Sequence, residues 1–202
     1  GKHAVKVVKN GTGTTVFFRD GSTHDTDCLI VADGIHSPIR RQLLPDSEPR
    51  YAGYTCWRAV IDNPGLNLTR ASETWGTEGR FGIVPLTKGR IYWFACVNAS
   101  QDDPAMQNMN IEGLARIFGR FHEPVPVILQ HTRDQDLIWN DIIDLKPQPQ
   151  FAFGNIVLIG DAAHATTPLL GQGAAMGLED SLVLGRHPAT SPSLETALAG
   201  YD

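Results

Sequence analysis

The sequence has 202 residues, enough for one sizeable domain or two small ones. Apolar residues make up 42% of it and charged residues 19%, as in ordinary globular proteins. A net charge of −5 offers no basic surface for nucleic acid or an anionic membrane, and no apolar run approaches the ~18 residues that a membrane span requires.

The N-terminal segment combines a hairpin, a buried strand and a short helix. Alternating apolar residues on both sides of an Asn-Gly-Thr-Gly turn predict a β-hairpin. The continuous apolar run at 28–32 predicts a strand buried on both faces, and it ends in an Asp-Gly pair. Ser37 and Pro38 are suited to the N-cap and the first position of the helix that follows.

The middle of the chain is rich in aromatic strand candidates separated by Gly, Pro or Asn turns. This texture predicts an antiparallel sheet, with strands at 54–61, 71–76, 80–86, 89–97 and 139–146. Residues 111–121 have helical spacing, with an apolar face formed by Ile111, Leu114, Ala115 and Phe118. A second short helix is expected after Pro124, and two prolines near residue 148 mark the end of this part.

The C-terminal part repeats the order of buried strand, acidic turn and helix. Residues 155–160 predict the strand, and a helix is expected at 173–185. Pro188 and Pro192 are expected to break the chain before a last helix at 193–201. The predicted fold class is therefore α/β (α+β). The predicted organisation is an α/β domain made of 1–50 and 149–202, into which a mostly antiparallel β-sheet domain, 51–148, is inserted.

The acidic turn and the glycines that follow it suggest a ligand site. Asp161 ends a predicted strand, and in open α/β sheets ligands lie outside the carboxyl ends of the strands. Gly171 and Gly173 remove side chains before a helix, so that a flat or anionic ligand can approach backbone N–H groups. Either feature alone is better explained as turn geometry. Together they favour a ligand with hydroxyl groups and a ring that becomes electron-rich.

Three segments carry a family resemblance. Residues 160–180, GDAAHATTPLLGQGAAMGLED, resemble the second flavin-binding motif of FAD-dependent monooxygenases of the para-hydroxybenzoate hydroxylase type. Residues 28–40, CLIVADGIHSPIR, resemble the Asp-Gly motif of that family. Residues 79–94, GRFGIVPLTKGRIYWF, are most similar to its zeaxanthin-epoxidase-like and urate-hydroxylase-like members. The resemblance thus covers most of the chain.

The resemblance implies FAD as cofactor and NAD(P)H as co-substrate. Asp161 would hydrogen-bond the FAD ribitol chain. The residues expected along the pyrimidine edge of the flavin, or in the turn beside it, are Gly160, Pro168, Gly171, Gly173 and Ala174. The dipole of the helix expected at 173–185 would stabilise negative charge on the reduced ring. Many relatives have Asn where this chain has Ala175, so no side-chain contact is expected there.

The Asp-Gly motif has its own implied role. Asp33, Gly34 and Arg40 would shape the crossing between FAD and NAD(P)H, and Arg40 would be a candidate for a pyridine-nucleotide phosphate. A full member of the family also has a G-x-G-x-x-G turn for the FAD pyrophosphate, and residues 10–16 do not supply it. We therefore expect a fragment that binds FAD weakly or not at all. An apolar sheet edge left exposed by the missing strands would favour self-association.

Arg80 and Tyr92 are the candidate substrate-binding residues. In urate-hydroxylase-like members, the resemblance implies, an Arg and a Tyr at corresponding places contact the substrate, and a guanidinium suits an oxygen-rich heterocycle. A surface Arg and a half-buried Tyr are an equally good explanation. Four aromatic residues could line a pocket or simply pack in the sheet: Trp57, Trp75, Phe81 and Trp93.

No catalytic acid–base pair or metal site is expected. His164 is better explained as a residue beside the flavin that hydrogen-bonds the backbone than as a base. Cys28, Cys56 and Cys96 lie far apart without a Cys-x-x-Cys pair, which indicates reduced thiols and a cytoplasmic location. Glu179 and Asp180 are expected to form structural ion pairs.

The leading hypothesis is part of an FAD-dependent monooxygenase that hydroxylates or epoxidises a small aromatic, heterocyclic or unsaturated substrate with NAD(P)H and dioxygen. A flavin-dependent reductase or dehydrogenase of the same superfamily is a second possibility. A non-catalytic fragment that binds a small ligand or a partner is a third. The expected partner is a small-molecule substrate, with no nucleic acid and no membrane span.

Overall fold

The computed structural model describes residues 1–11, 13–190 and 194–201. The chain divides into two compact units, Gly1–Arg50 with Ile143–Asp202 (unit 1) and Tyr51–Ile142 (unit 2). The return to unit 1 occurs within strand β9 (Ile138–Asp144), ahead of the prolines on which the sequence prediction placed the boundary. Each unit has hydrophobic clusters of its own.

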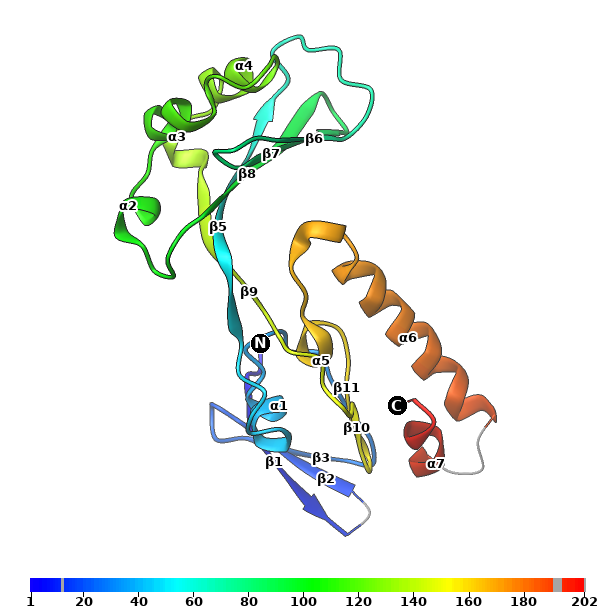
Figure 1. Ribbon diagram of the computed structural model, residues 1–202. Coiled ribbons are helices and arrows are strands. Elements are labelled where there is room, and N and C mark those ends of the chain that lie inside the picture. The colour runs from blue at the N-terminus through cyan, green and yellow to red at the C-terminus, as the bar shows by residue number, and fades with distance from the viewer. Residues whose placement is uncertain (12, 191–193, 202) are drawn as a thin grey trace. The chain divides into compact units, whose positions relative to one another are not determined.

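A three-stranded antiparallel sheet opens unit 1. Its strands are β1 (Ala4–Asn10), β2 (Gly13–Phe18) and β3 (Thr23–Thr26), in that order (Figure 1). The predicted hairpin is confirmed as β1–β2, with Asn10 opposite Gly13. Gln42 of helix α1 (Pro38–Leu43) bonds both the N–H and the C=O of Val7, so the helix is fastened to β1.

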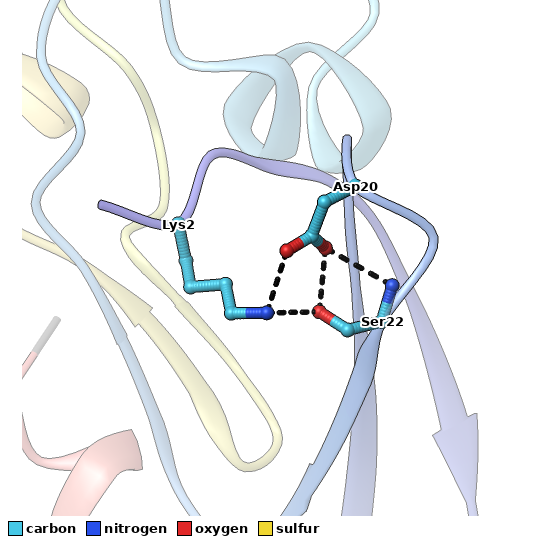
Figure 2. Close-up of polar contacts among 3 residues, drawn as sticks. All are labelled: Lys2, Asp20 and Ser22. Carbon is cyan, nitrogen blue, oxygen red and sulfur yellow. Dashed lines mark hydrogen bonds and ion pairs between the residues drawn. The ribbon is translucent and has the colours of Figure 1, made fainter.

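The turn between β2 and β3 is organised by one carboxylate (Figure 2). Asp20 accepts hydrogen bonds from the backbone N–H of Ser22 at 3.0 Å, from its hydroxyl at 2.6 Å and from Lys2 at 2.6 Å. These donors, with the Lys2 ammonium first, hold the pKa of Asp20 below its ordinary value. Gly21 has φ of +82°, so the turn uses the backbone freedom of glycine.

The second sheet of unit 1 brings the two predicted buried strands together. Strand β11 (Ile156–Leu158) pairs in parallel with β4 (Leu29–Val31) and antiparallel with β10 (Ala152–Phe153). All three residues of β11 are buried, as predicted. The prediction that β4 is buried on both faces is wrong. Ile30 is 52% exposed, because β4 is an edge strand that pairs with β11 alone among the described residues.

Helices follow the end of β11. They are α5 (Asp161–His164), the 3₁₀ turn η2 (Pro168–Leu170), α6 (Gly173–Thr190) and α7 (Leu194–Ala199). The predicted break at Pro188 is wrong, since α6 continues to Thr190. Pro188 removes a single backbone donor near the end of the helix, and the helix extends only two residues beyond it. Pro192 lies outside the described residues. Leu184 of α6 and Leu198 of α7 pack with Val157 of β11.

Unit 2 contains a five-stranded sheet in the order β6-β7-β8-β5-β9 (Figure 1). Its strands are β5 (Arg50–Asp62), β6 (Ser72–Trp75), β7 (Arg80–Leu86), β8 (Arg90–Asn98) and β9. The predicted antiparallel pairing is confirmed for β6–β7, β7–β8 and β5–β8. The helical elements are α2 (Pro104–Gln107), α3 (Ile111–Phe118), α4 (Val125–Gln130) and η1 (Asp134–Asp136).

One face of this sheet forms the core of unit 2 with α3 and α4. Phe81 stacks on Trp93 with ring centroids 5.1 Å apart, and Phe118 of α3 meets Phe81 edge-on at 5.7 Å. Trp57 is also fully buried here, so three of the four aromatic candidates are packing residues. The helical face of 111–121 is confirmed except at Ala115, which is exposed. No helix among the described residues is long and apolar enough to span a membrane.

Candidate functional site

A cavity of about 670 Å³ lies in unit 1, where the ends of β4 and β11 meet the entrance of α6. Its walls come from four short segments of chain that the sheet and α6 bring together. The lining residues are Ala32, Gly34, Ile159, Gly160, Asp161, Thr166, Thr167, Pro168, Gly171, Gly173, Ala174 and Gly177. All predicted cofactor residues except Asp33 and Arg40 are in this set. Parallel pairing of β4 with β11 places the two predicted motifs at one end of one sheet.

The turn after β11 presents a carboxylate to this cavity. Gly160 has φ of +56°, a conformation that favours glycine, and a Cβ built on it would meet nothing within 4 Å. The chain turns there, so Asp161 lies at the cavity wall with an exposed side chain. Among the described residues, the Asp161 carboxylate has no hydrogen-bond or ion-pair partner. Its oxygens are therefore available to accept from ligand hydroxyl groups.

Glycines form an open shelf on the other wall. Gly171 has φ of +62°, and a Cβ on it would meet nothing within 4 Å. A Cβ on Gly173 would meet only the Thr166 methyl group at 3.8 Å. Side chains at these positions would extend into free space, so their absence leaves room for a flat ring beside the backbone.

The entrance of α6 carries free donors on this shelf. The first helical bond runs from Met176 N–H to Gln172 C=O, so the N–H groups of residues 173–175 have no acceptor within the helix. The first turn of α6 contains no acidic residue to offset the positive end of the helix dipole. This wall therefore favours partial negative charge on a ligand.

Asp180 holds the acidic turn to α6. Its Oδ2 accepts a hydrogen bond from Gly160 N–H at 2.7 Å and contacts His164 Nε2 at the same distance. His164 thus pairs with a carboxylate instead of the backbone partner expected from sequence, and its ring meets Phe151 edge-on at 5.9 Å. Gly177 approaches closely as well, since its added Cβ would lie 3.7 Å from Gly160 Cα.

The sequence contains a signal for the contact between α6 and the turn at Gly160. Gly173, Gly177 and Asp180 are spaced i, i+4 and i+7, which places them on one face of a helix. Asp180 has a structural role through its contact with His164, and its side chain is 14% exposed, whereas Glu179 is exposed beside it. The threonines Thr166 and Thr167 are cavity residues that the sequence reasoning did not single out.

Arg40 is placed differently from the prediction. It is fully buried, and its guanidinium donates to Ile35 C=O at 2.6 Å, Ser47 Oγ at 3.1 Å and Ala162 C=O at 3.5 Å. Burial, followed by the charge of Arg41, lowers the pKa of Arg40. In this structure Arg40 ties the Asp-Gly loop to α5, and with no exposed surface its guanidinium is not accessible to a nucleotide phosphate. Asp33 is exposed beside the cavity residue Gly34.

The second face of the unit 2 sheet, which we call the open face, brings Arg80 and Tyr92 together. Arg80 of β7 is opposite Cys96 of β8, and Val84 is opposite Tyr92. Because side chains alternate along a strand, positions 92 and 96 of β8 share one face with position 80 of β7. The sequence had left open whether the two candidates share a face.

Arg80 is held in place by four neighbours. It pairs with Glu73 at 3.3 Å, and its guanidinium carbon lies 5.3 Å from the Tyr54 ring centroid and 5.6 Å from that of Trp75. It also contacts the Cys96 thiol. The Arg80 side chain is only 18% exposed, so it is a positioned cation with much of its donor capacity in use.

Tyr92 lies further along the open face. Burial raises the pKa of its phenol, with a smaller contribution from Cys56, so the hydroxyl is a hydrogen-bond donor at neutral pH. Its ring lies 6.1 Å from that of Phe94. The Phe94 ring in turn covers Gly82 of β7, where an added Cβ would fall 2.1 Å from ring carbons. The open face thus offers aromatic surface and polar groups together.

Residues 2–190 match the family described as FAD binding domain. The chain is 40% identical over 190 residues to an aurachin C monooxygenase/isomerase from Stigmatella aurantiaca, covering 94% of this chain and 49% of the relative. It is 31% identical to an FAD-dependent urate hydroxylase from Klebsiella pneumoniae, covering 100% of this chain and 53% of that protein.

Among solved structures, Klebsiella pneumoniae HpxO complexed with FAD and uric acid matches with a TM-score of 0.92 and 31% identity. This match covers 100% of the chain and 53% of the HpxO chain. The chain therefore spans about half the length of the curated relatives that it matches.

Proposed function

The chain belongs to the FAD binding domain family, and from this premise we propose that it forms the flavin-ring and substrate-binding part of an FAD-dependent monooxygenase. The substrate would be a small aromatic, heterocyclic or unsaturated molecule, with NAD(P)H and dioxygen as co-substrates. The observation that carries the proposal is the glycine shelf beside the unpaired carboxylate of Asp161. Several relatives are monooxygenases or hydroxylases by name, which supports the same activity.

The residues present fit FAD. Asp161 would accept hydrogen bonds from the ribitol hydroxyl groups. The backbone from Gly171 to Ala174, with Pro168 opposite, would lie along the pyrimidine edge of the ring, where the α6 dipole stabilises negative charge. FAD would supply the redox chemistry, while the chain orients it and excludes water. The free N–H groups at the α6 entrance support this placement more directly than any side chain.

The substrate would bind on the open face of unit 2. Arg80 would meet an oxygen or a negative charge of the substrate, and the hydroxyl of Tyr92 would donate a second hydrogen bond. The shared face of the two residues and the aromatic ring of Phe94 support this role. A polar heterocycle or an aromatic acid has the matching chemistry.

The cofactor site can be tested by titrating the chain with riboflavin and following flavin fluorescence. We expect weak, saturable binding that Asp161→Ala reduces at least threefold, because the ribityl hydroxyl groups lose their acceptor. Glu179→Ala is the matched control, since Glu179 is acidic and exposed but does not line the cavity. Equal losses in both variants would reject the assignment. Sub-micromolar binding of FAD itself would reject the expectation of weak affinity.

The activity should be assayed with the protein encoded by the whole open reading frame in which this chain occurs. We expect substrate-dependent oxidation of NAD(P)H with consumption of dioxygen. Arg80→Gln should raise KM for an anionic or oxygen-rich substrate about tenfold or more, since a charged hydrogen bond is worth ~1.5–3 kcal/mol. Oxidation of NAD(P)H without oxygen uptake would favour a reductase instead.

We propose a cytoplasmic location, which the three free thiols Cys28, Cys56 and Cys96 support. Self-association through the edge strand β4 is supported by the exposed Ile30. Light scattering should then detect oligomers of the chain that Ile30→Lys disperses. A monomer at all concentrations would contradict this part of the proposal.

A further inference from the structure

We propose that Cys56 and Cys96 form a reversible redox site, a cross-strand dithiol that hydrogen peroxide converts to a disulfide on the open face beside Arg80. The proposal concerns a covalent modification that the flavin site does not require. It can therefore be tested on this chain without any cofactor.

The sheet register places the two cysteines together. Cys56 of β5 is the direct partner of Cys96 of β8 in the antiparallel ladder. Directly opposed residues have Cα atoms about 4.5–5.5 Å apart, which lies within the range that a disulfide spans. The Cys56 thiol donates to Trp57 C=O at 3.4 Å, and each thiol is the first influence on the pKa of the other. Bond formation thus needs a rotation of side chains and no new approach of the strands.

The two thiols are electrostatically unequal. The neighbouring Cys56 thiol lowers the pKa of the Cys96 thiol, and the charge of Arg80 lowers it further, whereas burial and Glu73 oppose the shift. The neighbouring Cys96 thiol, followed by burial, raises the pKa of Cys56. Cys96 is therefore the more acidic thiol and the expected attacking group, and Cys56 is the resolving thiol. Both residues are less than a tenth exposed, so a small oxidant is required.

The chemistry balances with hydrogen peroxide as the two-electron oxidant. The Cys96 thiolate attacks one peroxide oxygen, the O–O bond breaks, and a sulfenic acid and hydroxide form. The sulfur of Cys56 then attacks the sulfenic sulfur. The S–O bond breaks, the hydroxyl leaves as water after taking a proton, and the S–S bond forms. In total the two thiols lose two electrons and two protons, and peroxide becomes two molecules of water.

Oxidation would change the surroundings of Arg80. The thiol that Arg80 contacts would become part of a neutral disulfide, and Arg80 would keep Glu73 as its ionic partner. Cys28 offers an internal contrast, because it lies in unit 1 and burial raises its pKa. A peroxide-sensitive pair and an insensitive third thiol are thus expected in one chain.

The test is to treat the reduced, folded chain with hydrogen peroxide, count thiols and map disulfides by peptide mass spectrometry without reduction. We expect the three thiols to fall to one, with a single Cys56–Cys96 linkage that dithiothreitol reverses. Cys28→Ser should leave that linkage intact. Cys56→Ser should stop oxidation at a Cys96 sulfenic acid that dimedone captures. Chain unfolded in urea, by contrast, should give mixed pairings.

Arg80 is tested as a positioning residue through the pH profile. Arg80→Gln should move the pH midpoint of Cys96 oxidation upward and slow the reaction severalfold at neutral pH, whereas Arg80→Lys should restore most of the rate. An unchanged profile would remove Arg80 from the proposal. Three results would overturn the proposed dithiol site. They are a disulfide that includes Cys28, the same mixed pairings in folded and unfolded chain, and over-oxidation of Cys96 while Cys56 is present.

Discussion

Replacing Asp180 by alanine should loosen the turn that carries Asp161. The wild-type carboxylate accepts from Gly160 N–H and pairs with His164, both at 2.7 Å, with its side chain 14% exposed. Hydrogen bonds to a charged group contribute ~1.5–3 kcal/mol each in buried sites. Two such bonds would sum to ~3–6 kcal/mol, and partial exposure of the side chain reduces the expected loss to about 2–3 kcal/mol in unit 1.

Amide hydrogen exchange measures this loss at the turn itself, since Gly160 N–H has Asp180 as its acceptor. A change of 2 kcal/mol corresponds to about a 30-fold loss of protection. Asp180→Asn keeps an acceptor oxygen and should lose less. Glu179→Ala, one residue away on the exposed side, should leave the amide unchanged. Protection of Gly160 within threefold of wild type in Asp180→Ala would refute the reasoning.

Two further predictions concern packing and pH. Gly82→Ala should destabilise unit 2 by about 1–3 kcal/mol in urea unfolding, because the alanine Cβ would overlap the Phe94 ring. Adding Phe94→Ala to the same chain should recover part of this loss. Gly185→Ala, whose Cβ would meet nothing within 4 Å in α6, should be neutral or stabilising. Acidification should release the β2–β3 turn, because its donors lower the pKa of Asp20. The contribution of the Asp20 carboxylate to stability is fully present above the ordinary carboxyl pKa. It is lost as the pH falls through the pKa of Asp20 in the folded chain. Asp20→Asn should remove this acid-dependent step from a hydrogen-exchange profile of the turn.

Patterns local to one strand or helix predicted most of the fold. The Asn-Gly turn fixed the first hairpin, and Ser37 with Pro38 fixed the start of α1. Aromatic alternation identified the unit 2 strands. The misses depended on partners that a local pattern does not contain. Ile30 has the apolarity of a buried residue, and its exposure follows from the edge position of β4.

In the candidate site too, local features were predicted and contacts with distant partners were not. The two motifs predicted most of the cavity wall, because glycines and a strand-end carboxylate determine local backbone and charge. They did not predict the burial of Arg40, whose acceptors Ile35 and Ala162 come from both motifs. The pairing of Cys56 with Cys96 required the strand register, which depends on long-range contacts.

The most direct test of the account is to map riboflavin on the chain by amide chemical shifts. We expect perturbations at Gly160, Asp161 and residues 171–174, and Asp161→Ala should weaken them together. Perturbations confined to other residues, or none as riboflavin approaches its solubility limit, would contradict the claim that the glycine shelf beside Asp161 holds a flavin ring.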